Sequence, residues 1–269
     1  MAAGFGMIGY GAIGIEIADA LHRLGERDRL LATLVREGRG APGAVHSVGD
    51  LFAARPSLVI ECAGHDAVRA YVPTLLELGI DCIVSSIGTL ADAAFDRELA
   101  AAERRGGGRL LLPAGAIAGL DGLVAAALAG IDRVTYTSFK PPHAWIGTAA
   151  ETLIDLDAGP SEQVFFAGSA REAAAAYPKN ANVAVAVGLA GIGIDRTQVR
   201  LVSSRDVSDP LGVIDAEGAF GRFGFDILAL ASRSNPKTSA LTAYSLLQCA
   251  RLGTALPVRD LIGSTAAAV

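Results

Sequence analysis

The feature that most constrains this chain is a glycine-rich stretch near its start. An apolar run covers residues 5–8, and an amphipathic helical pattern begins at Ile15. Between them lie Gly9, Gly11 and Gly14 in the spacing Gly-x-Gly-x-x-Gly. The first glycine permits a tight turn, the second lets backbone N–H groups approach a pyrophosphate, and the third lets the helix pack closely on the strand. Together with the positive N-terminal end of the helix, the stretch predicts a dinucleotide-binding unit.

Short strands and helices alternate through the first half of the chain. The strand-like segments are residues 30–35, 58–65, 81–88 and 109–112. The helical patterns cover residues 15–24, 47–54, 66–78 and 91–105. This alternation is typical of a parallel sheet with right-handed crossovers. We therefore predict an α/β, doubly wound dinucleotide-binding domain over residues 1–112.

The pattern changes at Pro113. Strand-like segments now follow one another mostly through turns, at residues 133–139, 164–168, 198–203, 212–216 and 223–231. Such spacing favours an antiparallel or mixed sheet, so we predict a second, α+β catalytic and dimerisation domain over residues 113–235. The remaining segment, 236–269, contains a helical pattern at about residues 238–251 that we expect to pack back on the first domain.

Composition argues against several classes of protein. Of the 269 residues 51% are apolar and 19% are charged, and the net charge of −5 gives no reason to expect nucleic acid or an anionic membrane as a partner. No apolar stretch is long enough for a membrane span, and no basic leader precedes the first strand. Three scattered cysteines suit neither a disulfide framework nor a metal cluster, and they favour a reducing cytoplasm.

Three groups of residues are predicted to contact the dinucleotide. They are Gly9, Gly11, Ala12, Ile13 and Gly14 in the glycine-rich stretch, Ala63, Gly64 and His65 at the end of a strand-like segment, and Arg36. Arg36 follows the second strand, where NAD-selective proteins often have an acidic residue that binds ribose hydroxyls. An arginine there can pair with a 2′-phosphate, so NAD or NADP is predicted as the cofactor. The alternative is a solvated surface arginine.

Three polar tracts hold every lysine of the chain. Lys140, Lys179 and Lys237 each adjoin a proline, and the other twenty of the 23 basic residues are arginines. A compact ammonium group on a rigid turn suits a carboxylate or an amide oxygen in a small pocket, so at least one lysine is predicted to have a site role. The alternative is that they are ordinary loop residues.

Two asparagines precede the apolar helical pattern at residues 183–190. Asn180 is predicted to cap that helix. Asn182 falls in its first turn, where asparagine is a mediocre helix former, so we interpret its amide as a ligand for the carboxamide of nicotinamide. A local backbone hydrogen bond that closes the turn is the alternative.

Four histidines are available for proton transfer. His22 and His46 are expected to be solvated. His65, beside the predicted cofactor, and His143, in a lysine-proline tract, are candidates to titrate near neutral pH, although a structural role is the alternative for each. The sequence has no metal-ligand spacing of histidine, cysteine or carboxylate residues, and no Gly-x-Ser-x-Gly motif. No metal site is therefore predicted.

These motifs together resemble the L-aspartate dehydrogenase family. The residues that carry the resemblance are 9–14, 61–65, 115–117, 177–183, 189–197, 218–221 and 235–239. Family members oxidise L-aspartate with NAD or NADP to iminoaspartate, and their fold is a Rossmann domain followed by an α/β catalytic domain. The resemblance implies a small amino, imino or keto acid as substrate, a homodimer or higher homo-oligomer, and cofactor contacts from Ala116 and Asn182.

One departure from the family concerns its catalytic histidine. The family carries this residue in an Asn-x-His segment shortly before Gly-x-Phe-Gly, and the matching positions here are Pro210 and Gly212. A glycine cannot take up a proton, and we expect it to leave an opening of imidazole size. His143 and Lys179 are predicted as replacement bases. The alternatives are a shifted substrate, or a dinucleotide-binding pseudoenzyme or sensor.

Overall fold

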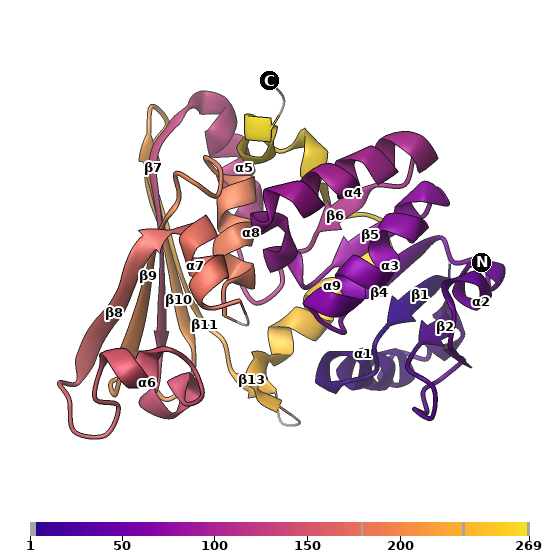
Figure 1. Ribbon diagram of the computed structural model, residues 1–269, viewed down its shortest axis with the longest axis horizontal. Helices are drawn as coiled ribbons and strands as arrows, with labels where there is room; N and C mark the ends of the chain where they lie inside the picture. The colour runs from indigo at the N-terminus through magenta and orange to yellow at the C-terminus, as the bar shows by residue number, and fades with distance from the viewer. Residues whose placement is uncertain (1–3, 179, 233–234, 268–269) are drawn as a thin grey trace. The chain divides into compact units, whose positions relative to one another are not determined.

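The computed structural model describes residues 4–178, 180–232 and 235–267. Its internal contacts divide the chain into two compact units (Figure 1). The first unit contains Met1–Gly115 and Ala240–Arg259, and the second contains Ala116–Ser239 and Asp260–Val269. The chain therefore leaves the first unit after residue 115 and returns to it for residues 240–259.

The first unit is built on a seven-stranded sheet in the order β14-β6-β5-β4-β1-β2-β3. Its strands are β1 (Phe5–Ile8), β2 (Leu30–Leu34), β3 (Ala44–Val45), β4 (Leu58–Glu61), β5 (Asp81–Val84), β6 (Leu110–Leu112) and β14 (Leu256–Pro257). All neighbouring strands are parallel except β14, which pairs antiparallel with β6. This is the doubly wound sheet that the strand–helix alternation predicts.

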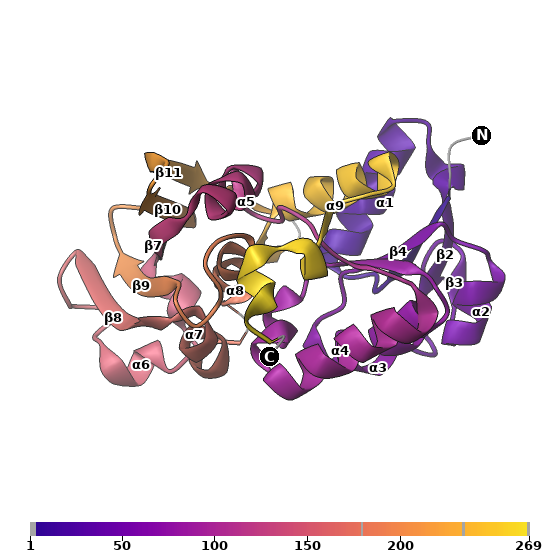
Figure 2. The ribbon, with the colours of Figure 1, turned by 90° about the horizontal axis from the view of Figure 1, so that it is seen from above.

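Helices cover both faces of this sheet. They are α1 (Ala12–Arg23), α2 (Val48–Ala53), α3 (His65–Glu77), α4 (Ala93–Gly106) and α9 (Ala240–Leu252), with short 3-10 turns at Arg27–Arg29, Ile87–Ala91 and Val258–Asp260. Figure 2 shows α1 and α9 on one side of the sheet and α3 and α4 on the other. Because both faces are covered, the central strands are apolar and buried rather than alternating.

The last helix contributes to the core of the first unit. Met7, Ile60 and Ile83 of the sheet lie in one buried cluster with Leu246 and Leu247 of α9. Fully burying a side chain of this size contributes about 1.5–3 kcal/mol, so the apolar face of α9 stabilises the sheet beneath it. The chain between residues 240 and 259 is thus an integral part of this unit.

Ion pairs also join the returning segment to the first unit. Arg251 Nη2 lies 2.9 Å from Glu26 Oε1. Arg259 donates to Glu103 from Nε and to Asp96 from Nη1, both at 2.6 Å. Pairs at the surface contribute little, but the partly buried Arg259 holds two carboxylates of α4 at once and thereby fixes where the segment ends.

The second unit is built on a five-stranded sheet in the order β11-β10-β7-β9-β8. Its strands are β7 (Ile131–Lys140), β8 (Glu162–Ser169), β9 (Gln198–Ser204), β10 (Leu211–Gly218) and β11 (Gly221–Leu228). β7 pairs parallel with β9, whereas the other three pairings are antiparallel. The predicted mixed sheet is confirmed.

Helices of the second unit pack on this sheet. They are α5 (Leu120–Ala129), α6 (Ala150–Leu153), α7 (Ala170–Ala176) and α8 (Asn182–Ala190), with 3-10 turns at Pro142–Trp145 and Ile262–Ala267. α5, α7 and α8 contact β10, β8 and β7, respectively, and α8 packs against both other helices. The backbone of a small hairpin, β12 (Ala231–Ser232) and β13 (Asn235–Ser239), completes the unit.

Some predicted boundaries are wrong. β4 ends at Glu61 and His65 is the first residue of α3, so His65 does not end a strand. β5 likewise ends at Val84 rather than at residue 88. The Glu61 carboxylate accepts hydrogen bonds from backbone N–H groups after both strands, and these bonds take the place of further strand pairing. Residues 235–239 form β13, and the helix begins only at Ala240.

Two observations bear on the setting of the protein. Within the described ranges, no helix combines the length and apolar character needed to cross a bilayer. Cys62, Cys82 and Cys249 are free thiols, and Cys82 is buried. Burial raises the pKa of the Cys82 thiol well above its usual range, so this cysteine is a small core residue and not a reactive thiolate.

Candidate functional site

The loop between β1 and α1 has the geometry that its glycines predict. Gly9 has φ +97°, and a Cβ added there would lie 2.7 Å from Ala63 Cβ. A Cβ on Gly14 would lie 2.7 Å from the Gly9 carbonyl oxygen, whereas one on Gly11 would meet nothing within 4 Å. The first and third glycines are therefore required for packing. Gly11 alone faces open space, where a phosphate can approach the backbone.

The N-terminus of α1 fits an anionic group. Gly11 is its N-cap and supplies no side-chain cap, and the first turn, which contains Ala12 and Ile13, has no acidic residue. A helix of this length offers unpaired N–H donors and a partial positive charge at its first turn. These residues therefore fit the pyrophosphate of a dinucleotide, a group they would hold through backbone N–H donors.

A buried glutamate organises the loops beside this glycine-rich turn. Glu61, at the end of β4, is 1% exposed. Its Oε1 accepts the N–H groups of Ala63 and Gly64, each at 2.7 Å, and the Ser86 hydroxyl at 3.1 Å. Its Oε2 accepts the Ser86 N–H at 3.0 Å. One carboxylate thereby fixes the loops after β4 and β5, and it sets Ala63 against Gly9.

Two effects act on the pKa of Glu61 in opposite directions. Burial raises its pKa, and hydrogen bonds from the N–H groups of Gly64, Ser86 and Ala63 and the Ser86 hydroxyl counter that rise. Glu61 was not among the predicted site residues. A glutamate that ends an otherwise apolar strand, Leu58–Glu61, was the sequence signal that could have identified it.

Arg36 lies just beyond the end of β2 and is exposed. Among the described residues its guanidinium group has no hydrogen-bond or ion-pair partner, although its backbone carbonyl accepts the Arg39 N–H at 3.1 Å. A free guanidinium at the end of the second strand can form a bidentate contact with a phosphate group. The position therefore fits the 2′-phosphate of NADP.

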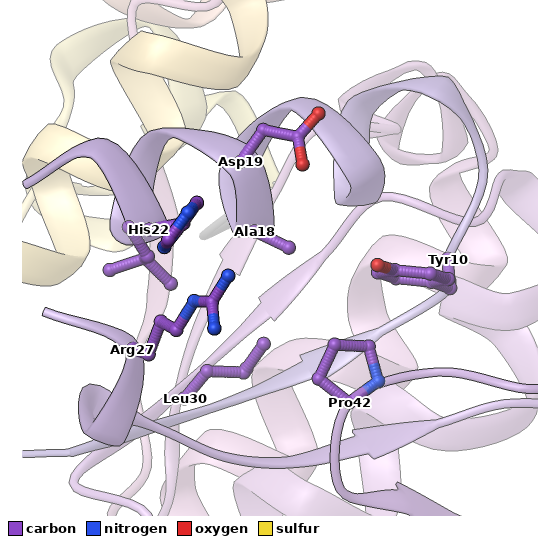
Figure 3. Close-up of a pocket in the computed structure, with 8 residues that line it drawn as sticks. Tyr10, Ala18, Asp19, His22, Arg27, Leu30 and Pro42 are labelled. Carbon is purple, nitrogen blue, oxygen red and sulfur yellow. The ribbon is translucent and has the colours of Figure 1, made fainter. Parts of the chain in front are cut away.

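A separate pocket of about 340 Å³ lies along the flank of α1 (Figure 3). Its lining residues are Tyr10, Ala18, Asp19, Leu21, His22, Arg27, Leu30 and Pro42. In Figure 3, Tyr10 and Pro42 stand at one end of the pocket, and His22 and Arg27 stand at the other. Most of its polar side chains are exposed and of mixed charge, so the pocket favours no single class of ligand. His22 is solvated as expected.

The second unit contains a lysine in unusual surroundings. Lys140, the last residue of β7, donates from Nζ to Asn180 Oδ1 at 2.7 Å. The same Nζ lies 4.9 Å from the ring centroid of Trp145, a cation–π distance. Trp145 is fully buried, packs edge-on against Phe165, and donates from Nε1 to the Val202 carbonyl at 3.2 Å. Burial lowers the pKa of Lys140 to about 8.

Asn180 does not cap α8 as predicted. The N-cap residue is Ala181, which provides no side-chain hydrogen bond to the helix. The amide oxygen of Asn180 accepts the bond from Lys140, 40 positions earlier in the chain. This long-range bond joins two of the lysine-proline tracts, and no local pattern in the sequence indicates that pairing.

The Tyr136 ring lies next to Gly212. Gly212 is buried on β10, and a Cβ added there would lie 3.3 Å from Tyr136 Cε2 and 3.5 Å from the Tyr136 hydroxyl oxygen. The ring of Tyr136 therefore lies against the position of a side chain at residue 212, and the imidazole-sized opening stays a prediction. Burial raises the pKa of Tyr136 to about 12, against the effect of a hydrogen bond with Ser138. The phenol is therefore neutral at pH 7.

The other predicted residues lie at separate places. His143 is exposed in the 3-10 turn after β7, and the nearest atoms to a Cβ on Gly212 belong to Tyr136 and Ile117. Lys179 lies outside the described residues. Ala116 is half-buried in the turn before α5, and Asn182 is the first residue of α8. In the described ranges no group of three or more histidine, cysteine or carboxylate residues could hold a metal ion.

Comparison with known protein families identifies relatives of both halves of the chain. A model described as "Homoserine dehydrogenase, NAD binding domain" matches residues 9–113. A model described as "Aspartate dehydrogenase, C-terminal" matches residues 121–252.

Individual relatives match nearly the whole chain. L-aspartate dehydrogenase of Polaromonas sp. (strain JS666) is 44% identical over 253 residues, which cover 90% of this chain and 94% of the relative. L-aspartate dehydrogenase of Ruegeria pomeroyi is 45% identical over 239 residues, covering 89% and 84%. The crystal structure of aspartate dehydrogenase from Thermotoga maritima superposes with a TM-score of 0.73 at 26% identity, covering 94% of this chain and 97% of that one.

Proposed function

This chain belongs to the aspartate dehydrogenase family, and on that premise we propose that it oxidises the amino group of L-aspartate, or of a related small amino acid, with NAD or NADP. The observation that carries this proposal is a match at 44% identity that covers nine-tenths of the chain. The reverse reaction, reductive amination of a keto acid, uses the same groups.

The cofactor is assigned to the first unit. Its pyrophosphate would be held by the loop and first helical turn formed by Gly9, Gly11, Ala12, Ile13 and Gly14, and Ala63, Gly64 and His65 would flank it. The family resemblance also assigns cofactor contacts to Ala116 and Asn182. When bound, the cofactor supplies a nicotinamide ring that accepts a hydride from the Cα of the amino acid.

Arg36 is proposed to bind a 2′-phosphate and thereby to give NADP at least parity with NAD. Support comes from its exposed guanidinium group, which has no partner among the described residues. Binding of NADPH and NADH to the same protein, measured by fluorescence titration, tests this assignment. A preference for NADH would contradict it.

Proton transfer is the step that the Gly212 substitution affects. Hydride removal needs a neutral amine, so a protein group must take the proton from the substrate ammonium, and a positioned base accelerates such a step by about 10²–10⁴-fold. We assign this role to His143 or Lys179. The two variants His143→Gln and Lys179→Gln each remove one candidate base. The variant that lacks the true base should have the lower kcat.

The activity itself is tested with two panels of substrates. The first measures NADH and NADPH formation with L-amino acids at alkaline pH, and the second measures NAD(P)H consumption with keto acids plus ammonia. We expect L-aspartate, or a small relative of it, to react. Protein that binds NADPH but is silent in both panels would contradict the proposal.

A second candidate function is a dinucleotide-binding sensor or pseudoenzyme. The specific observation in its favour is Tyr136, whose ring lies 3.3 Å from the position of a Cβ on Gly212, where the family carries its catalytic histidine. Such a protein would bind NADPH as tightly as an active dehydrogenase does and would show no turnover with either substrate panel.

Cellular setting and assembly are further proposals. Free thiols support a reducing cytoplasm. Leu228, the last residue of β11, and Leu230, two residues beyond it, are 59% and 67% exposed and support assembly of a homodimer or higher homo-oligomer. Light scattering coupled to gel filtration would test the assembly, and a single monomeric species would contradict it.

A further inference from the structure

We propose that Lys140 binds a carboxylate group of the substrate, with Asn180 holding its ammonium group in place. This inference rests on the proposed function, because it names the part of the substrate that the second unit recognises. It concerns substrate binding, and the proton transfer assigned to His143 or Lys179 remains a separate role.

Among the described residues, the Lys140 ammonium group has fewer acceptors than N–H donors. An ammonium group has three N–H donors, and within the described ranges Lys140 donates only to Asn180 Oδ1, at 2.7 Å. Its remaining electrostatic contact is the face of Trp145, at 4.9 Å from the ring centroid. No carboxylate of the described part of the chain forms an ion pair with it. A partly buried cation without an anion is unfavourable, and a carboxylate ligand would supply the missing hydrogen-bond acceptors and the counter-charge.

The strand register places this lysine close to Gly212. Ser138 of β7 pairs with Gly212 of β10. Side chains two residues apart on a strand share a face, so Tyr136, Ser138 and Lys140 all lie on the face that Gly212 occupies. Tyr136 and Lys140 are then the two diagonal neighbours of Gly212 on β7, and such neighbours are about 7–8 Å apart. Lys140 therefore adjoins the position where the family carries its catalytic histidine.

The residues around Lys140 hold its side chain in a position where it can bind an anion. Trp145 is held by its bond to Val202 and by its contact with Phe165, and the Asn180 N–H donates to the Tyr177 carbonyl at 2.8 Å. Burial alone lowers the pKa of Lys140 to about 8. A bound carboxylate would raise that pKa again, so binding near pH 8.5 should draw a proton from solvent.

The kinetic test compares three variants of the full chain. Lys140→Met should raise KM for the amino acid about 10- to 100-fold, with kcat within a few-fold and an unchanged Kd for NADPH. Lys140→Arg keeps the charge and should recover part of that loss. Arg133→Met is the matched control, because Arg133 is an exposed cation of the same strand that pairs with Glu217, and it should change nothing. A fall in kcat at constant KM would overturn the proposal by making Lys140 the base.

A binding measurement separates this inference from the proposed activity. Succinate presents two carboxylates and no amine, so it can bind without turnover. Calorimetry of NADPH-loaded protein at pH 8.5, in two buffers of different ionisation enthalpy, should show succinate binding with proton uptake in the wild type and much weaker binding in Lys140→Met. This result would support the role of Lys140 even if no amino acid were oxidised. Equal succinate binding by both proteins would overturn it.

Discussion

Two charged side chains, the buried Glu61 of the first unit and the partly buried Lys140 of the second, differ in how completely the protein satisfies them. The Glu61 carboxylate receives four hydrogen bonds, three from backbone N–H groups and one from a hydroxyl. The Lys140 ammonium, in the described residues, has one hydrogen-bond acceptor and an aromatic face. The hydrogen bonding of Glu61 is therefore satisfied without a ligand, whereas Lys140 has no counter-charge among the described residues.

This difference indicates different roles. A charge whose partners all come from the chain fixes the backbone, and Glu61 does so for the loops that adjoin Gly9. A charged group whose N–H donors are not all used can bind a ligand from outside the chain. Lys140 is the candidate for such binding. Burial shifts the pKa of both groups in the direction that disfavours the charged form. The pKa shifts therefore do not distinguish the two roles, whereas the number of hydrogen-bond partners does.

The largest effect is expected from removal of the satisfied charge. Glu61→Ala leaves the N–H groups of Ala63, Gly64 and Ser86 without their acceptor, and unfolding in urea should show a loss of about 3 kcal/mol or more. NADPH binding should weaken with it. Glu61→Gln keeps one acceptor oxygen and should lose clearly less. A Glu61→Ala protein as stable as the wild type would show that this network does not hold the loops.

A gain of activity is the next largest expectation. Gly212→His together with Pro210→Asn restores the Asn-x-His pair of the family, and a positioned imidazole should raise aspartate oxidation about 10²-fold or more. The new Cβ lies 3.3 Å from Tyr136, so the ring must shift by a few tenths of an ångström. Adding Tyr136→Phe removes the hydroxyl at 3.5 Å and serves as the control for crowding. No gain in either background would favour a rebuilt site.

Lys140→Met is expected to change the free energy of unfolding by less than Glu61→Ala does, and in the opposite direction. Because its pKa is lowered on folding, the charged lysine destabilises the folded state below about pH 8. Lys140→Met should therefore stabilise the unliganded protein at pH 7 by roughly 1–3 kcal/mol. As pH rises from 8 towards the unfolded pKa of about 10.4, the wild type gains stability and the difference should vanish. Denaturation at pH 7 and pH 10 measures it, and a destabilised variant at pH 7 would contradict the comparison.

The smallest effect is expected at an exposed charge. Arg36→Asp should lower the ratio of NADP to NAD affinity about tenfold, through the loss of one charge-assisted contact, and should leave folding stability unchanged. Fluorescence titration with both reduced cofactors measures this ratio. An unchanged ratio would show that Arg36 is a solvated surface residue.

The parts of the fold that are local in sequence were predictable. The glycine spacing and the strand–helix alternation predicted the first sheet, and segments joined by turns predicted the mixed sheet of the second unit. The end of β4 was not predictable, because it depends on hydrogen bonds that Ser86, 25 positions further on, donates to the Glu61 carboxylate. The same holds for the bond between Lys140 and Asn180 and for the Tyr136 ring beside Gly212, which follow from strand register and tertiary packing.

The titration of the lysine side chains tests the central claim most directly. The chain has three lysines, Lys140, Lys179 and Lys237, so the Nζ or Cε signals can be followed one by one by NMR and assigned with Lys140→Met. The account predicts that Lys140 titrates near pH 8 in the unliganded protein and moves upward when succinate is added to the NADPH-loaded form. Titration of Lys140 near pH 10.4 in both states, like a solvated lysine, would contradict it.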